Sequence, residues 1–485
     1  MTTAVVGAEE AAADLSSGHG TGPSITRLVD GMLTVRMILL HSLVAEVTRR
    51  LPDTADGAGL SLAYHSLAEL QQSHPAEVAK LLSYPHTGPW LARVLQRIQT
   101  ESDTETTPLW ADCGYLGWIA AAAGITCRPE GSMKLVVRNG AVMLPGIGLA
   151  RLGPTEECGH CELRWTDAGA LHFARDTTTV VVSSMDDESD PAWLPLRRVR
   201  GTVDEWEVIL DDIDPFRDVM GVNTPTRLTA AEAQSWQQDF TAAWDLLRRD
   251  FNQYLVPMRS CFTVLAPLST QPVTASSSYT SATGVGCVYT TAPADPCQLA
   301  LTLIHEIQHT KFTLLSDQIA LFEPDSACRF YAPWRDDPRP ILGLLHGIYA
   351  FFGVTDFWRV HRRSDCHRMP QAHVDFELWR MQVRGAMTQA LASGLLTAAG
   401  KQFIDTLEAA THLWENEDVP AEARLVASEA SAAHRTFWRV RNLIPEPGKI
   451  ADLAARWATR SPNPKMMVSG QAVAVGGADT GCCWL

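Results

Sequence analysis

The spacing of apolar residues changes twice along the chain, and these changes constrain the fold more than any other feature of the sequence. From residue 24 to about 124, apolar side chains recur at intervals of three and four, as on one face of a helix. Between residues 131 and 212 the apolar runs are short and are separated by turn residues, which is typical of strands. Beyond residue 297 the helical spacing returns. We therefore predict an α+β protein with a helical N-terminal region, a β-rich middle and a mostly helical C-terminal domain.

The same changes predict a division of the chain into regions. We expect a disordered segment over residues 1–22, a helical domain over 23–130 and a β-rich region over 131–228. A zincin-like catalytic domain over 229–460 and a flexible tail over 461–485 should follow. The two terminal segments are rich in small residues, which favours disorder. In the β-rich region, Asn139-Gly140 lies between two apolar runs and predicts a hairpin turn.

The charge balance excludes some partners. Forty Lys and Arg residues against 55 Asp and Glu residues give a net charge of −15, which argues against nucleic acid and against an anionic membrane surface. The longest weakly polar run, Leu116–Cys127, is too short for a membrane span, and charged residues interrupt Leu33–Leu51. No secretory signal is recognisable, and the 11 cysteines are irregularly spaced. We therefore expect a cytoplasmic protein with reduced thiols.

One motif points to chemistry. The pentad HEIQH, from His305 to His309, follows Asp295-Pro296, a favourable start for a helix. Residues four apart share a helix face, so both imidazoles can bind one metal ion. Glu306 lies beside them and can reach a bound water. This is the H-E-x-x-H arrangement of metal-dependent hydrolases.

A catalytic site of this kind needs a third protein ligand, and the sequence offers two candidates. His346 lies in a second apolar helical run, 37 residues after His309, and Glu323 could return to the site through a turn at Pro324. Asp317 would lie about 12 Å along the helix axis from His309, too far to share the metal. The choice between His346 and Glu323 stays open.

An arginine-rich segment, from Arg329 to Pro340, lies between these candidate ligands. Its aromatic and proline residues stiffen the backbone around Arg335 and Arg339, whose planar guanidinium groups suit carboxylates. Tyr331 could donate a hydrogen bond to a developing oxyanion. The alternative is a surface loop that ion pairs hold together.

Three segments carry a resemblance to a known family. LIHEIQHTK, FYAPWRDDPRP and GLLHGIYAFFGVTDFWR resemble the 2-oxoglutarate-dependent HExxH-type peptide β-hydroxylases of ribosomal peptide natural-product pathways, and the similarity covers residues 255–445. The resemblance implies Fe(II) bound by His305 and His309, with 2-oxoglutarate as co-substrate. It also implies that Arg335 or Arg339 holds the distal carboxylate of 2-oxoglutarate. The expected substrate is the β-carbon of a residue in a precursor peptide, and other maturation enzymes of the pathway are possible partners.

Two other classes of function fit the same residues. In a zinc metallopeptidase, Glu306 would be the general base, and Tyr331 or an arginine would stabilise the oxyanion. In that enzyme class, an edge strand before the metal helix holds the substrate in extended form. The third possibility is a non-catalytic module that binds a leader peptide through the same strand.

Three further features give weaker signals. We interpret Cys158 and Cys161 as part of a tight turn, with a structural zinc or a redox pair as the alternative. His361, His367 and His373 lie among arginines and are interpreted as a solvated basic segment. Cys482-Cys483 near the end of the chain would be reactive if exposed.

Overall fold

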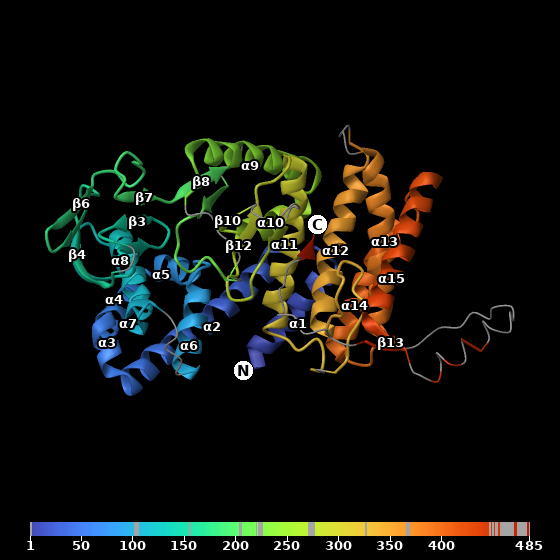
Figure 1. Cartoon of the computed structure of the whole chain (residues 1–485), viewed down its shortest axis with the longest axis horizontal. Coiled ribbons are helices and arrows are strands. Elements are labelled where there is room, and N and C mark those ends of the chain that lie inside the picture. Colours follow the sequence, from blue (N-terminus) through green and yellow to red (C-terminus); the bar gives the residue numbers. More distant parts are fainter. Residues whose placement is uncertain are drawn as a thin grey trace. The chain divides into compact units, whose positions relative to one another are not determined.

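A computed structural model of the chain shows an α+β protein with two compact units (Figure 1). Unit 1 comprises residues 1–25, 249–257 and 301–485, and unit 2 comprises residues 26–248 and 258–300. The structure describes residues 2–100, 106–154, 157–202, 206–219, 221, 227–269, 277–324, 327–364, 369–445, 448, 451, 454–455, 470–472 and 483–484. The predicted fold class is confirmed.

The helices of unit 2 form a layer around α8 (Tyr115–Cys127), which is buried along most of its length. Small residues let a strand pack closely against this helix: a Cβ at Gly114 would lie 2.5 Å from the Val136 side chain. The indole of Trp118 donates a hydrogen bond to the Val136 carbonyl. The other helices are α2 (Gly22–Arg50, which begins in unit 1), α3 (Pro52–Ala58), α4 (Leu60–Ser73), α5 (Pro75–Leu82), α6 (Thr87–Thr100) and α7 (Leu109–Cys113).

Two antiparallel sheets follow α8. The first has the order β1-β4-β5-β6 and the second the order β2-β3-β7. The predicted turn is present, because Asn139 and Gly140 both have positive φ and Arg138 pairs with Ala141. The strands on its two sides nevertheless enter different sheets. Their bounds are β1 (Gly131–Val137), β2 (Ala141–Leu144), β3 (Gly148–Arg151), β4 (Gly159–Trp165), β5 (Leu171–Arg175), β6 (Thr178–Val182) and β7 (Trp193–Pro195).

A third sheet of unit 2 contains strands in the order β11-β12-β10-β9-β8. Strands β9, β10 and β12 are parallel to one another, whereas β8 and β11 are antiparallel to their neighbours. The next helix, α9 (Ala230–Asp250), begins with a capping box, in which Thr229 and Glu232 each accept the other's backbone N–H. The strands are β8 (Arg197–Arg200), β9 (Glu207–Leu210), β10 (Val264–Leu268), β11 (Ser277–Tyr279) and β12 (Cys287–Thr291).

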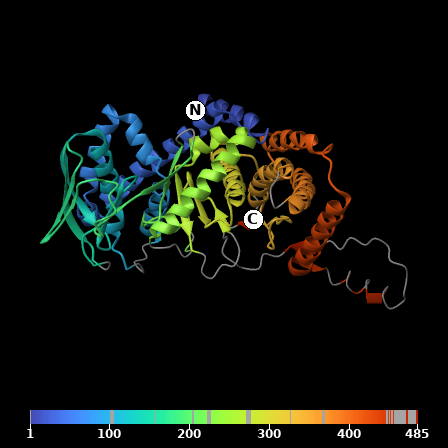
Figure 2. The same cartoon turned by 90° about the horizontal axis from the view of Figure 1, so that it is seen from above.

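Unit 1 is a helical bundle in which α12 (Ile341–His361) is the central helix. It packs beside α13 (Met369–Leu391), and α13 in turn packs against α15 (Ala421–Asn442), as the orange and red helices of Figure 2 show. The remaining elements are α1 (Thr2–Leu15), α10 (Asn252–Cys261, which ends in unit 2), α11 (Pro296–Ser316, which begins in unit 2), α14 (Ala398–Ala410), the 3-10 turn η1 (Thr411–Trp414), β13 (Leu443–Pro445), β14 (Gly470–Ala472) and β15 (Cys483–Trp484).

The structure divides the chain differently from the sequence prediction. The predicted helical domain and β-rich region share one core and lie in unit 2, together with most of α9. The prediction of disorder over residues 1–22 is corrected, because α1 occupies most of this segment and buries Ala11 and Leu15 completely. Small residues there fit a close helix packing that composition alone does not reveal. Most of the predicted tail, including Cys482, lies outside the described residues, but β14 pairs with β13.

Two helices are longer and more apolar than the sequence reading allowed. Helices α2 and α12 both reach the length and hydropathy of a membrane span, because the charged residues within each are few and widely spaced. In α12, 83% of the apolar window is buried inside the protein, as expected of a core helix. In α2 the buried share is only 22%.

Candidate metal centre

Helix α11 positions the HEIQH pentad. It begins where the Asp295 carboxylate accepts a hydrogen bond from the Gln298 backbone at 2.8 Å, as the sequence predicts for an N-cap. Leu303, Ile304 and Ile307 are buried on the apolar side of the helix. His305 and Glu306 are fully buried as well, which is costly for polar groups unless they are hydrogen-bonded, paired or bound to a metal.

The two predicted histidine ligands face each other. The Nε2 atoms of His305 and His309 lie 3.1 Å apart, and the ring planes are nearly perpendicular. Two nitrogen atoms that each lie about 2.1 Å from one metal ion, at an angle of roughly 90–100°, are themselves about 3 Å apart. The pair therefore fits a shared metal ion without rearrangement of α11.

His346 is the third histidine at this place. It projects from α12, with its ring centroid 5.7 Å from that of His309 and 4.7 Å from that of Phe312. His309 and His346 are partly exposed, whereas His305 is not. Among the described residues, no three His, Cys, Asp or Glu side chains already form a complete metal-binding group. The pair from α11 is in place, and His346 lies beside it.

Loss of surrounding water keeps these imidazoles neutral. It lowers the pKa of His305 to about 3 and that of His346 to about 4, the latter with a contribution from the Arg339 charge. Desolvation is the largest cause that holds the pKa of His309 well below its usual range, and the neighbouring His305 and His346 lower this pKa further. All three rings can therefore offer a lone pair to a metal ion at neutral pH.

Aromatic side chains cover the inner side of the histidine pair. The rings of Phe351 and His305 are nearly perpendicular, with centroids 5.3 Å apart, and Trp334 stacks on Phe351 with ring centroids 4.9 Å apart. This stack needs Gly347, because a Cβ at that position would lie 2.0 Å from the Trp334 indole. The Trp334 side chain comes from the arginine-rich segment, which is thereby fastened to α12 next to His346.

The arginine-rich segment is a closed loop. The backbone groups of Phe330 and Arg339 exchange two hydrogen bonds, which join its ends. Inside the loop the Asp337 carboxylate accepts hydrogen bonds from Arg335 at 2.8 Å and from Arg339 at 3.1 Å. Both arginine side chains are mostly buried, with 12% and 14% of their surface exposed. One carboxylate thus orients two guanidinium groups, and the charge of Arg339 acts on His346.

Two other predicted residues point elsewhere. The Tyr331 hydroxyl forms a hydrogen bond of 2.8 Å with Nδ1 of His434 on α15, and its ring packs against Trp438. Glu323, the alternative third ligand, is exposed, and its backbone N–H donates to the Leu395 carbonyl. The structure therefore groups His305, Glu306, His309, His346 and Arg339 on α11, α12 and the adjoining loop, but not Tyr331 or Glu323.

Of the residues that the structure describes, the cysteines and histidines that gave weaker signals in the sequence do not belong to the group around His305. Cys161 is buried in β4, and the Cys158 thiol contacts Asn139 of the turn at 3.7 Å. The interpretation of His361 as part of a solvated segment is wrong, because this residue is buried and stacks on Phe357. His373 is partly exposed, beside Arg362, and His367 lies outside the described residues.

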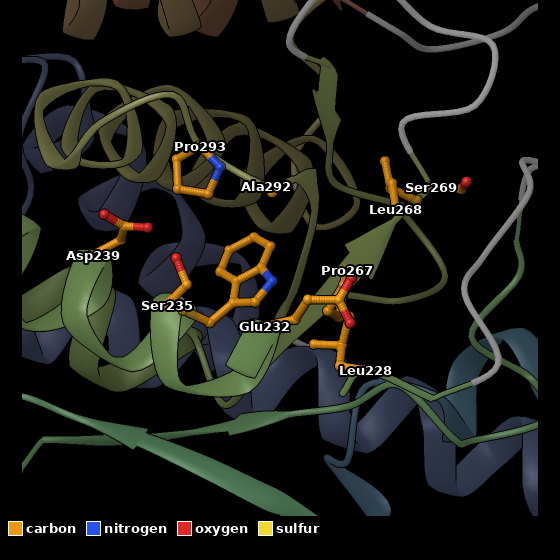
Figure 3. A pocket seen from close by; sticks show the side chains of 10 residues that line it. Leu228, Glu232, Ser235, Asp239, Pro267, Leu268, Ser269, Ala292 and Pro293 are labelled. Carbon is orange, nitrogen blue, oxygen red and sulfur yellow. The ribbon is translucent and has the colours of Figure 1, made fainter. Parts of the chain in front are cut away.

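Unit 2 contains a separate pocket of about 240 Å³. It lies where the parallel strands β10 and β12 end, beside α9, and Figure 3 shows Glu232, Ser235 and Asp239 on that helix. Burial raises the pKa of Asp239, with a contribution from the charge of Asp295. None of the predicted site residues lines this pocket.

Comparison with known proteins does not assign the chain. No protein-family model matches it, and no curated protein is significantly similar to it.

Proposed function

We propose that this protein is an Fe(II)- and 2-oxoglutarate-dependent hydroxylase that acts on the β-carbon of a residue in a ribosomally made precursor peptide. The observation that carries the proposal is the histidine pair of α11, with nitrogen atoms 3.1 Å apart, beside His346 and the loop that holds Arg335 and Arg339. The resemblance of residues 255–445 to peptide β-hydroxylases supports the choice of co-substrate and substrate.

Each residue has a defined task in this proposal. His305, His309 and His346 hold the metal through neutral imidazole nitrogens. When bound, Fe(II) and 2-oxoglutarate supply dioxygen activation, with one oxygen atom going to the peptide and the other to succinate as CO2 leaves. Phe351 and Trp334 exclude water from the His305 side. Glu306 is buried and follows His305 directly in the sequence. Its carboxylate orients groups at the metal.

The arginine loop serves the co-substrate. A guanidinium group binds a carboxylate through two parallel hydrogen bonds, provided that its orientation is fixed. Asp337 fixes both Arg335 and Arg339, and of these two Arg339 acts electrostatically on a metal ligand. We therefore assign the distal carboxylate of 2-oxoglutarate to Arg339.

Two observations disfavour the zinc peptidase. Strand β12, which precedes α11, pairs with β10 on one side and β11 on the other, so it has no free edge for an extended substrate. The Tyr331 hydroxyl, the proposed oxyanion donor, is engaged by His434. The same pairing of β12 also disfavours leader-peptide binding through this strand.

A direct test uses the full chain purified without oxygen. The protein is loaded with Fe(II) and 2-oxoglutarate, and the visible charge-transfer absorption of the chelate is recorded before oxygen and a ribosomal precursor peptide are added. We expect this absorption, a peptide heavier by one oxygen atom, and succinate in equal amount. His305→Ala should abolish all three signals, while Lys401→Ala, at an exposed position on α14, should retain them.

The outcomes separate the three classes of function. Cleavage of the peptide with Zn(II) and without 2-oxoglutarate would establish the peptidase instead. Tight peptide binding that His305→Ala does not affect, with no covalent change in the peptide, would establish the binding module.

A further inference from the structure

The segment that follows α1 contacts the metal helix through backbone carbonyl groups. Lys311 of α11 donates hydrogen bonds to the carbonyls of Gly18 at 3.2 Å and His19 at 2.7 Å. Gln308, between the two metal ligands in the sequence, donates to the Gly18 carbonyl at 3.1 Å. Gln308 and Lys311 both lie in unit 1 and are fully buried. We call residues Leu15–His19 the N-terminal clamp.

The N-terminal clamp also holds α12. The Tyr349 hydroxyl donates to the Leu15 carbonyl at 2.8 Å, and the Gln308 amide donates to the Tyr349 carbonyl at 3.1 Å. Tyr349 lies three residues after His346, so it is almost one turn along the same helix. The clamp therefore bonds to both helices that carry the histidines, and Gln308 links the two helices directly.

The backbone of the clamp is built for this close approach. Gly18 has a φ of +91°, and a Cβ there would lie 2.1 Å from the ring of Phe352 on α12. The Lys311 ammonium faces the rings of Tyr349 and Tyr254, 5.1 and 5.8 Å from their centroids. A buried amino group that donates to two carbonyl oxygens holds those oxygens in place, because leaving a buried donor without a partner would be costly.

We propose that the N-terminal clamp is a positioning element of the metal centre. It sets the rotation of α11 relative to α12, and so holds the His305–His309 pair opposite His346. On a helical wheel, Gln308 and Lys311 lie about 60° and 120° from His305, so the clamp fixes the helix from the flank of its metal-binding face. Lys311, Gln308 and Tyr349 are positioning residues. This inference rests on the proposed metal centre.

The test measures metal affinity and not only activity. Lys311→Met keeps the length of the side chain but removes its donors, and Tyr349→Phe removes one hydrogen bond to the clamp. Lys401→Met, at an exposed position on α14, is the matched control. Titration of each full-length variant with Co(II), followed by its visible absorption, should show affinity lowered roughly 10-fold or more by Lys311→Met, since residues that orient ligands typically contribute 10–100-fold. The effect of Tyr349→Phe should be smaller, and the control should match the wild type.

A reciprocal measurement keeps the proposal testable if Lys311→Met does not fold. If the clamp favours metal binding, metal must stabilise the clamp by the same free energy. Hydrogen exchange of the wild type should therefore slow over residues 12–20 when Co(II) is bound. Unchanged exchange there, with unchanged Co(II) affinity in the folded variants, would overturn the inference while leaving the metal centre intact. A wild type that binds no Co(II), Zn(II) or Fe(II) would overturn the proposed function as well.

Discussion

The Nε2 atoms of His305 and His309 lie 3.1 Å apart on a face of α11 from which most water is excluded. Two protonated imidazoles could not remain at this distance, because their charges would repel in a medium that screens poorly. Desolvation lowers the pKa of both rings, so both are neutral at physiological pH. Both the distance and the protonation state therefore suit the metal-binding role that we propose for the pair.

The third ligand can be identified by a pair of variants. We expect His346→Ala to weaken Fe(II) or Co(II) binding by more than about 100-fold, because it removes a ligand and not only a group that orients one. Glu323→Gln should leave the affinity unchanged, since Glu323 is exposed. Metal titrations of the two proteins, each compared with the wild type, make the measurement. The opposite result would assign a two-histidine, one-carboxylate site.

The two arginines of the loop should differ in their effect on 2-oxoglutarate. Arg339→Lys should raise the KM for 2-oxoglutarate by at least about 10-fold, because a lysine cannot form the bidentate pair with a carboxylate. Arg335→Lys should raise it much less, as the charge of Arg339 and not that of Arg335 acts on His346. Steady-state kinetics at saturating peptide give both values. A larger effect at Arg335 would reassign the co-substrate to that residue.

Gly347 should be sensitive to the smallest substitution. In Gly347→Ala the new Cβ would lie 2.0 Å from the Trp334 indole and must displace it from Phe351. We expect a loss of about 1–3 kcal/mol in the free energy of unfolding, with weaker metal binding through the adjacent His346.

The matched control for this variant is Gly385→Ala on α13. No atom lies within 4 Å of its added Cβ, and the site is exposed. Alanine there should stabilise the protein by roughly 0.5–1 kcal/mol because it favours the helix. Urea unfolding of both variants tests the contrast, which equal effects would contradict.

Stability should depend on pH through a buried pair of carboxylates in unit 2. Asp214 accepts a hydrogen bond from Tyr115 at 2.9 Å, and burial, with the charge of Asp211, raises the pKa of Asp214 to about 6. The folded state therefore binds this proton at a higher pH than the unfolded chain does. Stability from this group is present below about pH 4 and is lost as pH rises through 6. Asp211 has the opposite effect on stability at lower pH, because hydrogen bonds from His86 and Tyr84 hold its pKa well below its usual value. The stability that this ionised carboxylate contributes is lost as the pH falls.

Asp214→Asn isolates the first of these two groups. The amide can still accept from the Phe216 backbone and can donate to the Tyr115 oxygen, so the site stays satisfied. We expect the variant to be more stable than the wild type at pH 7.5, by on the order of 1 kcal/mol. Its free energy of unfolding should lack the decrease that Asp214 causes in the wild type between pH 4 and 7. Thermal unfolding across this range, monitored by a unit 2 tryptophan signal, makes the comparison. A wild type whose stability rises with pH between 4 and 7 would contradict the assignment.

Local patterns predicted the elements better than the units that they form. The helix start at Asp295 and the turn at Asn139-Gly140 depend on residues that are close in sequence, and both are present. The destination of the strands around that turn depends on pairing with distant strands, so it could not be predicted. The N-terminal clamp was missed for the same reason: its partners, Gln308 and Lys311, lie nearly 300 residues away, and its own composition suggests disorder.

The sequence alone determined that His305, Glu306 and His309 share a short stretch of helix, because spacing along a helix fixes which side chains are neighbours. It also determined that the two arginines lie in one stiff loop. Only the tertiary structure decided that His346 lies beside the pair, that Glu323 is exposed, and that the Tyr331 hydroxyl bonds to His434. These outcomes depend on how α11, α12 and α15 pack, and packing is a property of many side chains at once, which no local pattern contains.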